Sequence, residues 1–209
     1  MTRRTLLCCF VLVLVAAVVL PVMAQTGAPS FSADMKMTGK GITADGKLYS
    51  DGNKVRMEMN ARGQQSITIA DNTKKLAWMI MPAQKMYMEM STANAEKKGA
   101  SYRSYNPANP CEGLPNTTCT KVGTEMMNGE LCTKWQFVSK GNGPNLTTWI
   151  SQKSSIPVKT VTSDGSTMEL TNIKTGPQPA SLFQVPAGYQ KFDMTNMMKG
   201  LGGMRPPAE

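Results

Sequence analysis

The sequence predicts a single all-β domain built on a curved antiparallel sheet. Three observations support this: apolar and polar residues alternate in short segments, turn dipeptides separate these segments, and helical patterns are short and few. Asp51-Gly52, Asn128-Gly129 and Asp164-Gly165 are typical of tight hairpin turns. We expect about ten strands, and a sheet of that width must curl into a barrel, an incomplete barrel or a sandwich.

The predicted strands follow one another at short intervals. They are Phe31–Thr38, Gly46–Ser50, Lys54–Asn60, Ser66–Ala70, Lys75–Met81, Lys121–Met127, Glu130–Val138, Leu146–Gln152, Val158–Ser163 and Thr167–Lys174. Pairing across Asp51-Gly52 sets Leu48 opposite Val55. The strands that flank Asn72-Thr73 share one apolar face, made of Ile67, Ile69, Leu76, Trp78 and Ile80.

The segment Lys75–Met90 predicts a hairpin that is apolar on both sides. A two-residue turn at Pro82-Ala83 would set Met81 opposite Gln84, Met79 opposite Met86 and Ala77 opposite Met88. The methionines then lie on one face, and Trp78, Ile80 and Tyr87 lie on the other. Such a hairpin must be covered on both sides or line a lipophilic site.

Helical signals are short. Ser91–Lys98 predicts two turns after a serine N-cap, and Ala180–Gln184 predicts a single turn between two prolines. The segment Gly99–Pro115 contains Asn-Pro twice, which predicts a long loop able to act as a lid over one mouth of the sheet.

Residues 1–24 predict a cleavable signal peptide. Arg3 and Arg4 precede an apolar run from Leu6 to Leu20, and Ala24 is a small residue suited to signal peptidase. We therefore expect cleavage after Ala24 and a periplasmic or secreted protein. Residues 25–194 would form the single domain, and residues 195–209, rich in Gly and Pro, a disordered tail.

The basic charge of the chain is spread along the strands. After loss of Arg3 and Arg4, 21 of the 23 Lys and Arg residues remain against 14 Asp and Glu, a net charge of about +7. With few aromatic residues, this pattern argues against nucleic acid. The basic residues are therefore interpreted as solvated outer faces of strands or as a means of transient contact with an anionic membrane surface.

Histidine is absent from the sequence. Its absence removes the Ser-His-Asp and Cys-His nucleophilic sites and the commonest zinc ligand. The chain also lacks a nucleophile elbow, a Walker A loop and a CxxC motif. The sequence therefore predicts no catalytic residue, no cofactor and no metal centre of these kinds.

Three cysteines remain after cleavage, in an oxidising compartment if export is correct. In the hairpin at Asn128-Gly129, Cys132 lies opposite Glu125. Cys119 is six residues from Glu125 on the same strand, and is therefore roughly 20 Å from Cys132. A disulfide needs Cα atoms within about 7 Å, which excludes Cys119–Cys132. Both other pairings stay open, and we favour Cys111–Cys119 over Cys111–Cys132. Cys132 would then be a free, buried and inert thiol.

Methionine is the most informative residue type. Nine methionines have the spacing that places each group on one face of its strand: Met35, Met37, Met57, Met59, Met79, Met81, Met86, Met88 and Met90. They are interpreted as core packing, as a deformable lipophilic groove, or as thioether ligands for Cu(I). Lys54, Arg56 and Lys85 could attract headgroups at a groove mouth, and Trp135 and Trp149 are expected to be core aromatics.

Several segments resemble, in order, a bacterial family of exported proteins of unknown function. These are the hairpin Lys75–Met90, Val122–Trp135, Trp149-Ile150, Ile156–Lys159 and Glu169–Pro179, followed by the L-F-x-x-P-x-G-Y segment Leu182–Tyr189. That family is similar to outer-membrane lipoprotein-sorting proteins and periplasmic lipoprotein carriers. The resemblance implies an incomplete antiparallel barrel whose concave apolar face, capped by short helices or a loop, receives acyl chains. The carriers have a helix before the first strand, whereas in this sequence only about six polar residues separate Ala24 from Phe31.

Together these patterns predict a non-catalytic, exported and monomeric protein. Its expected role is to hold a lipid or an acylated protein on the concave face, at the nine methionines. The alternatives are a structural or interaction protein of the envelope with a methionine-packed core, or a methionine-based Cu(I)-binding protein.

Overall fold

The computed structural model describes residues 29–93, 109–112, 116–141 and 143–192. These residues form one sheet in the order β12-β6-β5-β4-β3-β2-β1-β11-β10-β9-β8-β7. The strands are β1 (Phe31–Gly39), β2 (Ile42–Asp51), β3 (Lys54–Ala61), β4 (Gln64–Asp71), β5 (Leu76–Met81), β6 (Met86–Ser91), β7 (Thr117–Met127), β8 (Glu130–Ser139), β9 (Leu146–Ser151), β10 (Pro157–Thr162), β11 (Thr167–Thr175) and β12 (Gln190–Lys191). Two 3₁₀ helices are η1 (Pro82–Gln84) and η2 (Ala180–Phe183).

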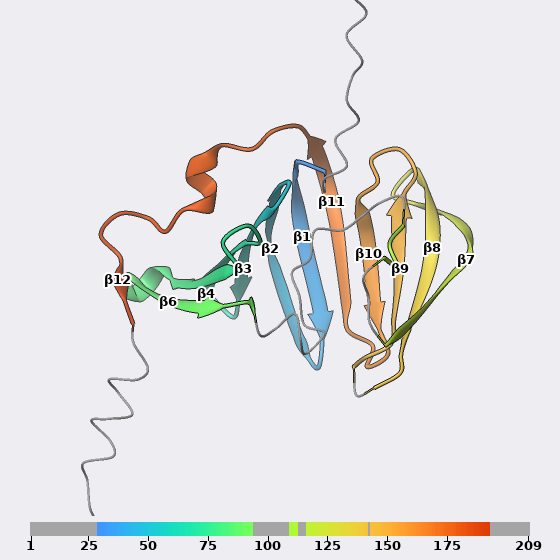
Figure 1. Cartoon of the computed structure of the whole chain (residues 1–209), viewed down its shortest axis with the longest axis horizontal. Helices are drawn as coiled ribbons and strands as arrows, with labels where there is room; N and C mark the ends of the chain where they lie inside the picture. Colours follow the sequence, from blue (N-terminus) through green and yellow to red (C-terminus); the bar gives the residue numbers. More distant parts are fainter. Residues whose placement is uncertain (1–28, 94–108, 113–115, 142, 193–209) are drawn as a thin grey trace, which may run out of the picture.

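The sheet is open, with β12 and β7 at its two edges (Figure 1). Every pairing is antiparallel except that of β12 with β6. β1 lies near the middle of the sheet and pairs with β2 and β11, so β2 to β6 extend the sheet to one side and β10 to β7 to the other. The predicted all-β fold with a curved antiparallel sheet that does not close into a barrel is confirmed.

Strands β6 and β7 are consecutive in the sequence but lie near opposite edges of the sheet, so the chain between them joins the two sides. Most of the predicted helix Ser91–Lys98 and of the predicted loop Gly99–Pro115 lies outside the described residues. Ser91, the predicted N-cap, is the last residue of β6. The predicted signal peptide and C-terminal tail also lie outside the described residues. No helix in the described ranges is long and apolar enough to cross a membrane.

The predicted register of the β5–β6 hairpin is wrong by two residues. Met81 pairs with Met86, Met79 with Met88 and Ala77 with Met90. The connection holds four residues rather than two, because Pro82 begins a 3₁₀ turn and Lys85 ends it in the left-handed conformation, donating its backbone N–H to the Pro82 carbonyl at 3.1 Å. A shift of two residues keeps every side chain on its predicted face.

The β2–β3 hairpin shows the same kind of error. The two turn residues are Gly52 and Asn53 rather than Asp51 and Gly52, so Leu48 pairs with Met57 and not with Val55. The predicted turn at Asn128-Gly129 is confirmed: both residues have positive φ, and Met127 pairs with Glu130.

The two faces of the sheet carry different apolar residues. The face that bears Met35, Met57, Met79 and Met88 is called the methionine face, and the face that bears Ile67, Ile69 and Ile80 is called the strap face. On the methionine face, a core cluster contains Phe31, Ala33, Met35, Ile156 and Leu170, with Met57, Met59 and Met168 packed against it.

The strap face of β3 to β6 is covered by residues 176–192, here called the strap. The strap runs from the end of β11 past η2 to the edge strand β12 (Figure 1). Phe183 of η2 packs against Ile67, Ile69 and Ile80, and the Leu182 carbonyl accepts a hydrogen bond from Arg56 at 2.9 Å. The predicted single turn at Ala180–Gln184 is thereby confirmed as η2.

The cysteines pair as favoured from the sequence. Cys111 is bonded to Cys119, with Cα atoms 5.6 Å apart, and Cys132 is a free thiol with no exposed surface. Burial, and secondarily the charge of Glu130, raises the pKa of the Cys132 thiol. Cys132 pairs with Glu125, as predicted.

Replacing Phe183 with alanine should lower the free energy of unfolding by about 3–5 kcal/mol, because it removes the buried ring that fastens the strap. Chemical denaturation measures the change. Gln184→Ala, at an exposed neighbouring position, is the control and should leave stability nearly unchanged. Equal stability of both variants would show that the strap is not anchored at Phe183.

Cys132 should resist a thiol-labelling reagent in the native protein and react after unfolding. Burial blocks access, and the raised pKa keeps the thiol protonated near neutral pH. Counting labelled thiols with and without denaturant measures this. Rapid labelling of the native protein would contradict the buried position.

Candidate functional site: the methionine face

All nine methionines singled out from the sequence lie on the methionine face. Directly paired residues share a face, so the pairings trace continuous rows across the sheet. One row runs through Ala33, Leu48, Met57, Thr68, Met79 and Met88. A second row contains Met35, Gly46 and Met59, and a third contains Met37 and Ala44. A fourth row contains Val55, Ala70, Ala77 and Met90. Met81 pairs with Met86.

The nine methionines differ in burial. Met35 is 2% exposed and belongs to the central core, whereas Met79 is 36% and Met90 42% exposed on β5 and β6. Met37, toward the end of β1, is 38% exposed. Met57, Met59, Met81, Met86 and Met88 are half-buried. The methionine face therefore changes from packed core near β1 to accessible surface at β5 and β6.

The β5–β6 hairpin is the most asymmetric part of this face. On its other side, Ile80 is fully buried in the cluster with Ile67, Ile69 and Phe183. Trp78 and Tyr87 pack against this cluster, as do the strap residues Leu182, Val185 and Tyr189. The strap therefore covers the strap-face side of this hairpin, which is apolar on both sides. The accessible methionines lie on the opposite side.

Lys54, Arg56 and Lys85 were expected to attract headgroups at a groove mouth. For Arg56 this prediction is wrong. It is buried on the strap face, where it donates to Glu58 at 2.7 Å and to the Leu182 carbonyl. Lys54 pairs with Asp71 and so points to the strap face as well. Lys85 is exposed in the turn between β5 and β6.

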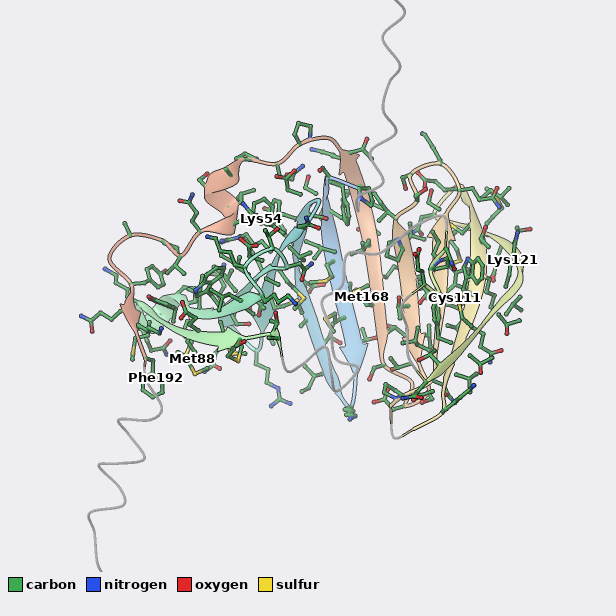
Figure 2. All side chains as sticks on the ribbon, in the orientation of Figure 1. Lys54, Met88, Cys111, Lys121, Met168 and Phe192 are labelled. Atoms are coloured by element: carbon green, nitrogen blue, oxygen red, sulfur yellow. A yellow bond between two sulfur atoms is a disulfide. The ribbon has the colours of Figure 1, made fainter. Side chains whose placement is uncertain are left out.

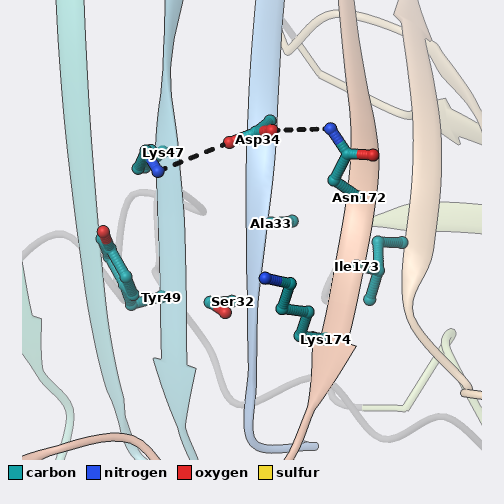
Figure 3. A pocket seen from close by; sticks show the side chains of 8 residues that line it. All are labelled: Ser32, Ala33, Asp34, Lys47, Tyr49, Asn172, Ile173 and Lys174. Atoms are coloured by element: carbon teal, nitrogen blue, oxygen red, sulfur yellow. Dashed lines mark hydrogen bonds and ion pairs between the residues drawn. The ribbon is translucent and has the colours of Figure 1, made fainter.

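A separate polar cavity of about 420 Å³ lies over β1, β2 and β11 (Figure 3). Its lining residues are Ser32, Ala33, Asp34, Lys47, Tyr49, Asn172, Ile173 and Lys174. The Asp34 carboxylate accepts a hydrogen bond from Asn172 at 2.8 Å and faces the Lys47 ammonium at 3.8 Å. Because its polar groups bind one another and none of the nine methionines lines it, this cavity is not suited to an acyl chain.

Trp149 is a core aromatic residue, as expected. It is 9% exposed, its indole N–H donates to Glu125 at 2.8 Å, and the Lys134 ammonium lies 4.8 Å from its ring centre. The indole hydrogen bond, and after it the charge of Lys134, lowers the pKa of Glu125. Trp135 is half-buried and pairs with Thr148.

Within the described ranges, no group of three or more His, Cys, Asp or Glu side chains is arranged to hold a metal ion. The chemically distinctive groups of the methionine face are thioethers. This face can exclude water, adapt its shape and offer soft sulfur atoms.

Several solved structures are similar to this chain at low sequence identity, and those with a TM-score of 0.50 or more share its fold. An uncharacterized conserved protein from Thermus thermophilus has a TM-score of 0.57 at 12% identity, covering 79% of this chain and 90% of that one. MucB, also solved as the Pseudomonas aeruginosa MucA/MucB complex, has a TM-score of 0.50 at 12% identity, covering 78% of this chain and 59% of MucB. The Mycobacterium tuberculosis lipoprotein LppX has a TM-score of 0.43 at 15% identity, covering 77% of this chain and 91% of LppX.

At these identities the likeness concerns the fold alone. No curated protein matches the chain in sequence. The predicted resemblance to a family of unknown function is confirmed. The family model described as "Domain of unknown function (DUF4412)" matches residues 32–154 and 140–189, and the chain belongs to this family.

Proposed function

We propose that this protein is an exported, non-catalytic binding protein that holds the acyl chain of a lipid or of an acylated protein on its methionine face. The observation that carries the proposal is the set of accessible methionines on β5 and β6. Met79 and Met90 are more than a third exposed, beside the half-buried Met81, Met86 and Met88. Such a surface gains free energy when an apolar ligand covers it.

The methionine face is continuous from the core to its accessible end. The row from Leu48 through Met57, Thr68 and Met79 to Met88 crosses five neighbouring strands, or about 19 Å at the usual spacing between strands. Leu48 and Met57 pack against the core cluster, and Met79 and Met88 lie at the accessible end, where the acyl chain is proposed to lie. Each buried methylene contributes about 0.8 kcal/mol. Methionine side chains are unbranched and can repack around chains of different shape.

Other features support export and an amphiphilic ligand. The Cys111–Cys119 disulfide fits an oxidising compartment, as the predicted signal peptide requires. The net charge of about +7 in the predicted exported chain favours anionic headgroups and transient contact with a membrane surface. MucB, which shares the fold, has been solved in complex with MucA. We expect this protein to work as a monomer.

The alternative of a purely structural envelope protein rests on Met35, Met57 and Met59. These methionines belong to or pack against the central core cluster, where they fill space in the protein's own interior. The proposal therefore assigns ligand contact to the outer methionines of β5 and β6 and a supporting role to the inner three.

Met79→Glu combined with Met88→Glu should weaken the binding of a lipophilic fluorescent dye by about a hundredfold or more. Burying a methionine contributes about 1.5–3 kcal/mol, and each 1.4 kcal/mol is a tenfold change in affinity. Dye titration measures the loss, and thermal melting verifies that the variant is folded.

Met126→Glu with Leu131→Glu is the matched control. These residues form a directly opposed, exposed pair at the far end of the sheet, 61% and 46% exposed. The control adds the same charges to a cross-strand pair and should bind dye as the parent protein does. A folded Met79/Met88 variant that binds equally well would place the apolar site elsewhere.

Native mass spectrometry of the exported chain, purified without detergent from an export-competent host, tests the proposal directly. A heterogeneous adduct of lipid mass that is lost on solvent extraction is the expected result. A bare mass, together with no binding of added fatty acid, would leave the structural alternative.

A further inference from the structure

The β5–β6 register brings four methionines into one block. Met79 pairs directly with Met88, and the next pair on the same face is Met81 with Met86 (Figure 2 labels Met88). The two-residue turn expected from the sequence would have opposed only Met79 and Met86. The four-residue turn around η1 therefore creates the block.

The spacing within this block lets several sulfur atoms approach one point. Directly opposed Cβ atoms in an antiparallel pair are about 4.5–5.5 Å apart, and residues two apart along a strand are about 7 Å apart. A methionine sulfur lies two bonds beyond Cβ on a chain with three rotatable bonds. Three or four thioethers can therefore converge above the centre of the block.

The donor set determines which ion fits. Thioethers are soft, neutral ligands suited to Cu(I), whereas Zn²⁺ is bound by thiolates, imidazoles or carboxylates and Cu(II) favours nitrogen and oxygen ligands. The chain has no histidine, and Glu89, the acidic residue of β6, lies on the opposite face, where it bonds Trp78 and Lys191. We propose that Met79, Met81, Met86 and Met88 form an all-thioether site for Cu(I).

Burial suits such a site. Met81, Met86 and Met88 are half-buried, and Met79 is 36% exposed, so an ion can enter from the solvent and lose most of its water. Among the described strand pairings, one other pair of methionines is directly opposed, Met37 with Met168. That pair offers two sulfurs and not four, which makes it an internal control.

The test uses the exported chain with ¹³C-labelled methionine methyl groups, titrated with Ag(I), a redox-inert analogue of Cu(I). Affinity for Cu(I) is measured without oxygen by competition with a chromophoric Cu(I) chelator. We expect one equivalent of ion to shift the methyl signals of Met79, Met81, Met86 and Met88 together.

Met81→Leu with Met86→Leu should weaken Cu(I) binding at least tenfold, because leucine keeps the volume and removes the sulfur. Met37→Leu with Met168→Leu should leave affinity unchanged. The proposal is overturned if the two double variants bind alike or if the four signals do not move. It is also overturned if the ion instead shifts the methyl signals of Met194, Met197, Met198 and Met204, the methionines near the C-terminal end of the chain.

This site does not depend on the proposed lipid function, and the same variants separate the two. Met81→Leu with Met86→Leu removes both sulfur atoms but keeps the face apolar, so it should lower the affinity for Cu(I) by a much larger factor than the affinity for dye. A parent protein that binds Cu(I) but neither dye nor lipid would remove the lipid proposal alone. A parent protein that binds dye but shows no methyl shift would remove the copper site alone.

Discussion

Antiparallel pairing holds directly opposed side chains on the same face of a sheet, and four successive pairings carry this constraint from β2 to β6. Because methionines recur at every second position in β3, β5 and β6, the pairings gather them on one face. The same alternation places Ile69, Trp78 and Ile80 on the other face. The contrast between an accessible thioether surface and a covered aliphatic surface follows from this single geometric rule.

The strap explains why only one of these faces is covered. Its contacts come from the L-F-x-x-P-x-G-Y segment, the most specific part of the sequence resemblance: Phe183 fills the isoleucine cluster, the Leu182 carbonyl satisfies Arg56, and Gly188 takes a positive φ before Tyr189. That motif is structural. It ties the C-terminal chain to β6 through β12, where backbone bonds and the Lys191–Glu89 ion pair protect the sheet edge.

The sequence was sufficient for the strand order along the chain and for the faces, because period-two alternation is a local property. It favoured the Cys111–Cys119 disulfide that the structure has, but left Cys111–Cys132 open. It was not sufficient for the register at Pro82–Lys85, where a proline that begins a 3₁₀ turn competes with a two-residue loop. It also gave no signal for the burial of Arg56. Arg56 is buried under the strap, and although its acceptor Glu58 lies two residues away, its other acceptor, the Leu182 carbonyl, lies 126 residues further along the chain.

The two proposals differ in how much they depend on register. An even register shift leaves every methionine on the same face, so an apolar ligand surface follows from the sequence pattern as well as from the structure. A metal site depends on which sulfurs are directly opposed, and a shift of two residues separates the Met79–Met88 pair. The Pro82–Lys85 turn therefore determines whether this face has only apolar character or also the chemistry of a soft metal ligand.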